Sequence, residues 1–252
     1  MLQKVQTGRV LKLTLDRPEK RNALNYDLCD ALVREIGDAA QDTGVGAILL
    51  TGMGKCFCAG MDLAEAAEVG VNEQINQVHD RLFSLGARIA KPLIGAVRGA
   101  AVGGGTGLVA NCHIVVASLD ATFGLPEIRL GLWPFLVYQA VAAAMGERRT
   151  LELSLTGRTL KVEEALDHGL VTEIAADPET RAAELAEMVA NFSPAAIQNG
   201  LCFVQEVRGQ DWESSSRVAR RIRDRVLSGP DFQEGVRAFQ EKRQPRWPSL
   251  AS

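Results

Sequence analysis

Three short segments of the chain carry residue types from which a catalytic site could be built. Residues 56–63 read Cys-Phe-Cys-Ala-Gly-Met-Asp-Leu, residues 103–107 read Gly-Gly-Gly-Thr-Gly, and residues 123–127 read Phe-Gly-Leu-Pro-Glu. Glycine lets a backbone approach a ligand closely because it has no side chain, and free N–H groups in such turns can stabilise an oxyanion. The first two segments are therefore candidate oxyanion sites, although tight structural turns would show the same composition.

Glu127 ends the third segment and is followed by the largely apolar stretch 128–133. Burial in apolar surroundings raises the pKa of a glutamic acid and suits its carboxyl group to proton transfer near neutral pH. A surface glutamate paired with Arg129 is the ordinary alternative, since most glutamates are solvated. The residues alone leave both interpretations open.

Other kinds of site fit the sequence poorly. The glycine run lacks the Gly-Lys-Ser/Thr of a phosphate-binding loop and the spacing of a dinucleotide fingerprint. His79, His113 and His168 do not have the spacing of metal ligands, so we expect no metal. Cys56 and Cys58 have no histidine close in sequence that would activate a thiol for nucleophilic attack.

Short apolar stretches lead into these segments and predict strands at residues 10–15, 47–51, 93–97 and 114–117. We predict a loop at 52–60 and a loop at 99–107 that turns into a buried helix. Helices are predicted at 26–40, with Asn25 as the N-cap, and at 72–90. Beyond residue 135 the pattern is helical, at 135–145, 147–155, 161–168, 179–190, 194–208, 212–227 and 231–241, with an exposed strand at 171–175. The expected architecture is an α/β core followed by a helical C-terminal part.

Composition limits the class of protein. The chain has 252 residues, 46% of them hydrophobic, with 28 basic against 31 acidic residues and a formal net charge of −3. This balance argues against nucleic acid as a partner. Five cysteines at irregular spacing indicate reduced thiols and a cytoplasmic location. The most apolar stretch, 93–117, is interrupted by charge and glycine, so we expect no membrane span.

The three segments, in this order and spacing, resemble the crotonase superfamily, also called the enoyl-CoA hydratase/isomerase family. Matching segments also occur at 15–18 (Leu-Asp-Arg-Pro), 22–25, 155–158 and 234–243, so the resemblance covers nearly the whole chain. It implies an α/β fold, a crotonase-like spiral of ββα turns with a helical C-terminal trimerisation region. We expect residues 1–195 to form the spiral core with the acyl-CoA site and residues 196–252 to join a homotrimer or a dimer of trimers.

The resemblance also implies the chemistry. Members of the family bind an acyl-CoA thioester and stabilise its enolate with two backbone N–H groups, which by motif position belong to Met61 and Gly104, with Glu127 as the acid–base. No cofactor is implied beyond the coenzyme A of the substrate. The expected substrate-binding residues are Ala23, Ala59, Asp62, Leu63, Trp133 and Lys242, of which Lys242 reaches a neighbouring subunit in the family pattern. For Asp62, a role in capping its loop is the simpler expectation.

Further expectations concern the two ends of the substrate. Arg17, Lys20 and Arg21 are candidates for binding the CoA phosphates. Helix 72–89 and residues 132–138 are expected to wall the acyl pocket.

One departure from the hydratase pattern bears on the reaction. Hydratases of the family carry a second glutamate at the position of Gly107, which here has no side chain. A single carboxylate suits the proton shift of a Δ3,Δ2-enoyl-CoA isomerase better than hydration, and a glutamate at 107 should raise hydration if the pocket has room for it. The first alternative is a 2-enoyl-CoA hydratase in which a loop residue such as Glu65 or Glu68, or a water molecule held differently, replaces the missing acid. The second is a catalytically weak interaction protein.

Two branches of the family fit less well. The dehalogenase branch needs an aspartate in the stretch that corresponds to residues 121–146, and this chain has none there. The dihydroxynaphthoyl-CoA synthases carry Ser-Gly-Gly-Asp-Gln where this chain has Ala-Gly-Met-Asp-Leu. RNA-binding relatives carry a lysine-rich helix face, whereas helix 72–89 offers only Arg81 and Arg88. The interaction protein therefore ranks last.

Overall fold

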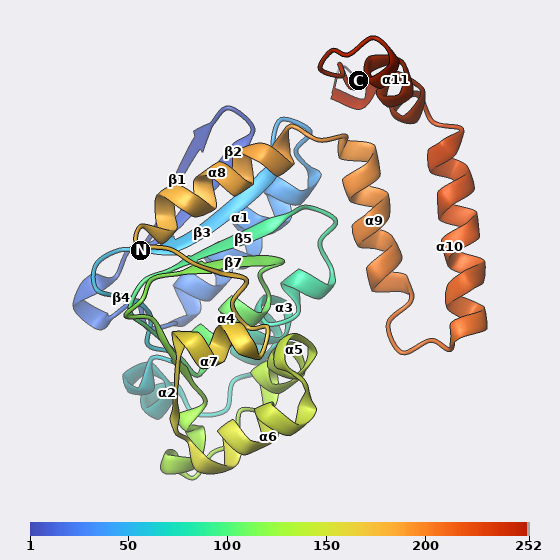
Figure 1. Cartoon of the computed structure of the whole chain (residues 1–252). Helices are drawn as coiled ribbons and strands as arrows, with labels where there is room; N and C mark the ends of the chain where they lie inside the picture. Colours follow the sequence, from blue (N-terminus) through green and yellow to red (C-terminus); the bar gives the residue numbers. More distant parts are fainter. Residues whose placement is uncertain (251–252) are drawn as a thin grey trace.

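The chain alternates between two sheets, as the computed structural model shows for residues 1–250 (Figure 1). The larger sheet has the spatial order β1 (Leu2–Thr7), β2 (Val10–Leu15), β3 (Ala47–Gly52), β5 (Leu93–Val97), β7 (Ile114–Ala117) and β10 (Glu173–Ile174). The smaller sheet has the order β4 (Cys56–Cys58), β6 (Ala100–Val102), β8 (Thr122–Gly124) and β9 (Thr159–Lys161). Because β3, β5 and β7 join the first sheet and β4, β6 and β8 join the second, the chain winds as the predicted ββα spiral.

Helices surround the sheets and continue beyond them. Their bounds are α1 (Tyr26–Gln41), α2 (Leu63–Val69), α3 (Glu73–Leu82), α4 (Gly104–Ala110), α5 (Phe135–Met145), α6 (Glu147–Thr156), α7 (Val162–Asp167), α8 (Pro178–Ala190), α9 (Pro194–Glu206), α10 (Trp212–Leu227) and α11 (Pro230–Gln240). Local signals explain several of the starts. The side chain of Asn25 accepts a hydrogen bond from the Leu28 N–H, as the predicted N-cap of α1 should, and Ser193 caps α9 in front of Pro194.

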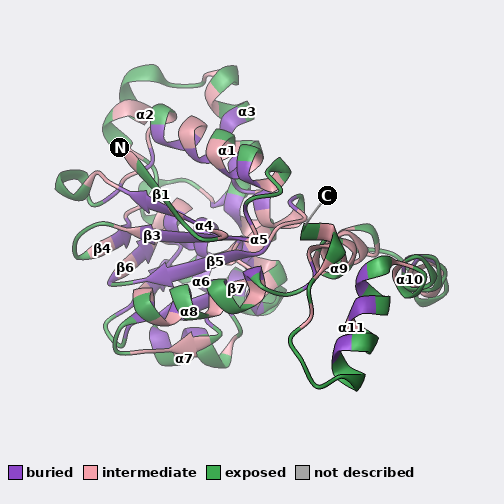
Figure 2. Ribbon diagram, turned by 90° about the horizontal axis from the view of Figure 1, so that it is seen from above, coloured by how far each residue is buried: buried purple, intermediate pink, exposed green. Residues whose placement is uncertain are grey.

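Within the larger sheet, β3 and β5 are buried on both faces, which explains why both are apolar runs, whereas the edge strand β1 is exposed. On one face Ile48 and Leu50 join the main core, and on the other Ala47 and Leu49 pack under α8. Figure 2 shows the buried residues concentrated in these sheets. The parallel pairing of β3, β5 and β7 brings their carboxyl ends to one edge, where the three glycine- and glutamate-containing segments follow.

The C-terminal helices form an arm. In Figure 1, α9 and α10 lie side by side and extend away from the sheets, with α11 at the end of the arm. A division between residues 195 and 196 would fall in the first turn of α9. The roles predicted for residues 1–195, as the core with the acyl-CoA site, and for residues 196–252, as the oligomerisation region, stay predictions. No helix within residues 1–250 is long and apolar enough to cross a membrane.

The strands predicted before residue 118 and the seven C-terminal helices are present within one or two residues at each end. The predicted helix over 72–90 is wrong in its second half, because α3 ends at Leu82 and a 3₁₀ turn follows at Leu85–Ala87. Gly86 explains the break: its N–H donates to Asn111 Oδ1, and its backbone lies so close to the Asn111 carbonyl that a Cβ would not fit.

The remaining differences concern short elements. The predicted loop segments at 52–60 and 99–107 contain β4 and β6, three residues each, and the helix expected after the glycine run is present as α4. Strands β1, β8 and β9 and helix α2 were not predicted. The predicted exposed strand at 171–175 shortens to Glu173–Ile174, and Val171 before it is buried. Strands of three residues are too short to show a periodic pattern.

Candidate active site

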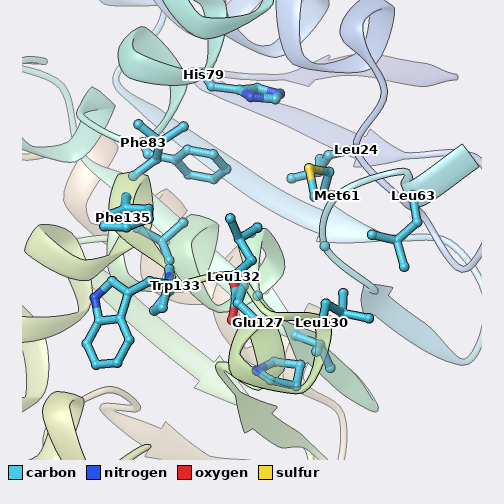
Figure 3. A pocket seen from close by; sticks show the side chains of 18 of the residues that line it. Leu24, Met61, Leu63, His79, Phe83, Glu127, Leu130, Leu132, Trp133 and Phe135 are labelled. Atoms are coloured by element: carbon cyan, nitrogen blue, oxygen red, sulfur yellow. The ribbon is translucent and has the colours of Figure 1, made fainter. Parts of the chain in front are cut away.

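The three segments meet at one pocket with a volume of about 280 Å³. Ala59 and Met61 line it from the first segment, Gly103 and Gly104 from the second, and Glu127 from the third. Leu24 and Leu63 add apolar wall (Figure 3). The sequence-based expectation that these segments converge is confirmed by their position around a single cavity.

The predicted helix and loop walls of the pocket are present as well. His79 and Phe83 come from the end of α3, and residues 132–137 form the opposite wall with the side chains of Trp133 and Phe135 among them (Figure 3). Tyr138 stacks obliquely with Trp133, at 6.3 Å between ring centroids, outside the lining residues. Most of the cavity surface is therefore apolar.

The backbone N–H groups of Met61 and Gly104 are free to bind a ligand. Met61 forms an isolated parallel bridge with Leu24 through its neighbours: Leu24 N–H donates to Gly60 O, and Asp62 N–H donates to Leu24 O. This pattern turns the N–H of Met61 itself away from Leu24. Gly104 is the first residue of α4, where an N–H has no partner inside the helix. Within residues 1–250, neither group donates to a protein acceptor.

Two glycines keep these turns together. Gly60 has a φ of 86°, and a Cβ there would lie 2.6 Å from the Val102 carbonyl oxygen. Gly103 has a φ of 55°, and a Cβ there would lie 2.9 Å from Glu127 Oε1. Side chains at these two positions would separate the turns from each other and from the carboxyl group, so the glycines have a geometric reason to be present.

Glu127 has the environment of a proton-transferring group. It lies in the 3₁₀ turn Pro126–Leu130 directly after β8, and its Oε2 is buried without a hydrogen-bond partner among the described residues. Burial raises the pKa of Glu127 above its usual value, against a smaller opposing effect of its own backbone N–H. The alternative of an ion pair with Arg129 is wrong, since the described residues contain no such pair.

The position of the second glutamate in hydratases is closed by packing. A Cβ at Gly107 would lie 2.4 Å from Val137 Cγ1 and 3.1 Å from Phe83 Cδ1. Neither Glu65 nor Glu68 lines the pocket in its place. The Glu65 carboxylate instead accepts a hydrogen bond of 2.9 Å from the Tyr26 N–H, and Glu68 is exposed.

Asp62 and Arg17 form a pair beside the pocket. The Asp62 carboxylate caps α2 and lies 3.1 Å from Arg17 Nη2, with both side chains less than 15% exposed. Although burial opposes it, the hydrogen bond from Arg17 holds the pKa of Asp62 below its usual range. The capping role expected for Asp62 is confirmed, while its role in substrate binding stays a prediction. Arg17 also donates a hydrogen bond of 2.6 Å to the Ala23 carbonyl. Its guanidinium group therefore contacts both Ala23 and Asp62, two of the predicted substrate-binding residues.

Other predicted site residues lie apart from the pocket. Lys20 and Arg21 are exposed in the loop before α1, and Lys242 is exposed at the end of the C-terminal arm, outside the lining residues. The thiols behind the first segment are not activated. Burial raises the pKa of Cys58 to about 12, and it also raises the pKa of Cys56, which donates to the Ala100 carbonyl.

His79 lines the pocket, a role that was not predicted from the sequence, where this residue was considered only as a metal ligand. It lies four residues after Ile75 and three before Leu82, on the apolar stripe of α3. That spacing was the available signal, because a polar residue on an inward-facing stripe either has a partner in the core or faces a cavity.

The fold and site define an enzyme class with a crotonase-type spiral, two unpaired N–H groups over a pocket and one buried carboxyl group. The family model described as Enoyl-CoA hydratase/isomerase matches residues 6–249, and the chain belongs to this family of acyl-CoA enzymes.

Individual relatives agree with this assignment. A putative enoyl-CoA hydratase of Thermus thermophilus is 37% identical over 96% of this chain and 99% of its own, and the 2,3-dehydroadipyl-CoA hydratase of Escherichia coli is 35% identical over 94% of each. The crystal structure of an enoyl-CoA hydratase from Bacillus anthracis superposes with a TM-score of 0.90 at 29% identity, covering 98% of this chain and 99% of that chain.

Proposed function

We propose that the protein isomerises 3-enoyl-CoA thioesters to 2-enoyl-CoA thioesters, with Glu127 as the single acid–base. In this reaction the Glu127 carboxylate removes a proton from C2, and the electrons of the broken C–H bond pass into a dienolate whose negative charge lies on the thioester oxygen. The carboxylic acid formed then returns the proton to C4, while the double bond comes to rest between C2 and C3.

The observation that carries the proposal is the single carboxylate in the pocket together with the closed position at Gly107. Hydration needs a group that deprotonates water and a group that protonates C2, whereas a 1,3-proton shift needs one carboxyl group that can reach both carbons. The raised pKa of Glu127 supports this use, because a basic carboxylate accepts a proton from carbon more readily.

The thioester oxygen is assigned to the N–H groups of Met61 and Gly104. Neither group has a protein acceptor within residues 1–250, and both line the pocket with Glu127. Hydrogen bonds aimed at a developing oxyanion are worth roughly 3–4 kcal/mol each in the transition state. Ala59, Leu63 and Trp133 also border the cavity, in agreement with contacts to the acyl-CoA. Coenzyme A enters as part of the substrate, and no other cofactor takes part.

Hydration of 2-enoyl-CoA is the second candidate, and the relatives favour it, since several of them are named as hydratases of CoA thioesters. Separate incubations with 3-hexenoyl-CoA and 2-hexenoyl-CoA, followed by chromatography of the products, distinguish the two. We expect 2-hexenoyl-CoA from the first substrate and little 3-hydroxyhexanoyl-CoA from the second. Faster formation of the hydroxy product than of the shifted alkene would replace isomerisation by hydration.

A further inference from the structure

His79 is a polar side chain in a wall that otherwise offers a ligand almost no hydrogen bonds. Apart from Glu127 it is the only ionisable residue that lines the pocket within the described chain, and Trp133 is the only other lining residue with a polar side-chain atom. No hydrogen bond or ion pair of the His79 imidazole occurs within residues 1–250. Its ring nitrogens are therefore available to a molecule in the cavity.

The position of His79 separates it from the reacting carbons. Its ring lies 6.0 Å from the Phe83 ring, centroid to centroid, and the tip of Phe83 in turn packs near Gly104, since Phe83 Cζ would be 3.1 Å from a Cβ there. Figure 3 shows His79 across the cavity from Glu127, with Phe83 and Met61 closer to the centre. His79 thus faces a part of the ligand other than the carbons that Glu127 serves.

The chemistry of the ring indicates what it would bind. Burial lowers the pKa of His79 below its usual value, against the opposing charges of Glu65 and Asp80. A neutral imidazole presents one N–H donor and one acceptor nitrogen. That pair matches a hydroxyl group, which donates and accepts, or a carbonyl group, which accepts, better than a saturated hydrocarbon tail.

We propose that His79 is a specificity-determining residue, which hydrogen-bonds a hydroxyl or carbonyl group on the acyl chain beyond the carbons that Glu127 serves. This inference rests on the proposed acyl-CoA function and deepens it, because it names the substrate class: acyl-CoA thioesters with an oxygen substituent on the chain. An unsubstituted chain would leave the imidazole without a partner inside a mostly apolar cavity, which disfavours that ligand.

The test uses saturated ligands, so that it does not depend on turnover. Dissociation constants of hexanoyl-CoA, 5-hydroxyhexanoyl-CoA and 6-hydroxyhexanoyl-CoA are measured by calorimetry for the wild type, His79→Leu and His79→Gln. We expect the wild type to bind one hydroxylated ligand about 10-fold more tightly than hexanoyl-CoA. His79→Leu should reduce this ratio to about one, and His79→Gln, which keeps a donor and an acceptor, should retain part of it.

His168→Leu is the matched control, because it removes a half-buried histidine at the end of α7, outside the lining residues of the pocket. Circular dichroism checks that each variant is folded. The same ratio in the wild type and in His79→Leu would overturn the proposal. Failure of the proposed isomerisation is seen separately, in the products formed from 3-hexenoyl-CoA.

Discussion

Val137 fills the space that a side chain at position 107 would need, because a Cβ atom at Gly107 would lie 2.4 Å from Val137 Cγ1 and 2.8 Å from Val137 Cβ. α5 thus packs directly on the turn of α4 where a hydratase-type glutamate would begin. Because the two helices pack this closely, position 107 has no space for that carboxylate, and we do not expect a single substitution at Gly107 to introduce a functional one.

For this reason we expect Gly107→Glu to destabilise the fold without raising hydration. Overpacking of a filled site costs about 1–3 kcal/mol, and the surrounding side chains here are held within the core. The double variant Gly107→Glu/Val137→Gly removes the two atoms that lie nearest to a Cβ at position 107, and it should hydrate 2-hexenoyl-CoA faster than Val137→Gly alone. Denaturant unfolding and product analysis measure both effects, and a stable, hydrating Gly107→Glu single variant would contradict the packing argument.

The N–H of Gly104 is tested by Gly104→Pro, with Gly104→Ala as its matched control. Both substitutions place a Cβ 3.0 Å from Leu24 Cδ1 and 3.1 Å from Phe83 Cζ, but only proline removes the N–H. Proline is also tolerated at the first position of a helix, which is the position of Gly104. We expect kcat of the proline variant to be about 10²–10³-fold below that of the alanine variant. Equal kcat in two folded variants would exclude this N–H as an oxyanion donor.

Much of this site follows from local signals in the sequence, and the rest depends on distant contacts. The turns at Gly60 and Gly103 could be predicted because their backbone conformations and close approaches require glycine. The packing of Val137 on Gly107 joins residues 30 positions apart in the sequence and depends on the placement of two helices. No sequence pattern near Gly107 predicts that contact.

The short strands escaped prediction for a related reason. β4, β6 and β8 pair with one another across 20 to 45 residues, and each is only three residues long. Their backbone hydrogen bonds come from the spiral as a whole rather than from their own side chains. His79 was missed because its helical spacing fits a core position as well as a cavity wall, and only the placement of α3 over the pocket separates the two.

The C-terminal arm carries exposed apolar side chains that suit an interface between copies of the chain. Phe239 is 85% exposed and lines, with Phe232 and Val236, a second cavity of about 610 Å³. We expect a trimer or hexamer by light scattering at micromolar concentration, and Phe239→Asp should shift it toward smaller species. Val71→Asp, which alters a side chain 98% exposed between α2 and α3, is the control that should leave the mass unchanged. A monodisperse wild-type monomer would contradict the expectation.

The capping carboxylate of Asp62 is expected to stabilise the turn that holds Met61. Asp62→Ala removes both the cap of α2 and the partner of Arg17, and a lost cap costs about 0.5–2 kcal/mol. Because the folded protein lowers the pKa of Asp62, this stabilisation is present at neutral pH and is lost as the pH falls through that lowered pKa. Asp62→Asn keeps a capping oxygen and should be less destabilised at pH 7. Urea unfolding at several pH values measures the stability of each variant. If the stability lost in Asp62→Ala did not depend on pH, the ion pair with Arg17 would not contribute to stability.

Glu127→Gln is expected to lower activity and raise stability at the same time. The amide keeps the size of the side chain but cannot carry a proton, so kcat on 3-hexenoyl-CoA should fall by at least 10²-fold. In the wild type, activity should fall as the pH drops through the raised pKa of Glu127, because the reaction needs the ionised form. A variant that kept more than about a tenth of the activity would place proton transfer elsewhere.

The stability effect has the opposite sign and its own pH dependence. A carboxyl group whose pKa is raised by folding stabilises the fold below its unfolded pKa, and this contribution is lost as the pH rises through the folded pKa. Above that folded pKa the wild type holds a buried carboxylate with an unpartnered Oε2, and Glu127→Gln removes that charge. We expect a higher Tm for the variant at pH 8 and a smaller difference near pH 4. A variant less stable than the wild type at both pH values would show that the Glu127 carboxyl group stabilises the fold, and that its burial does not lower the stability of the protein.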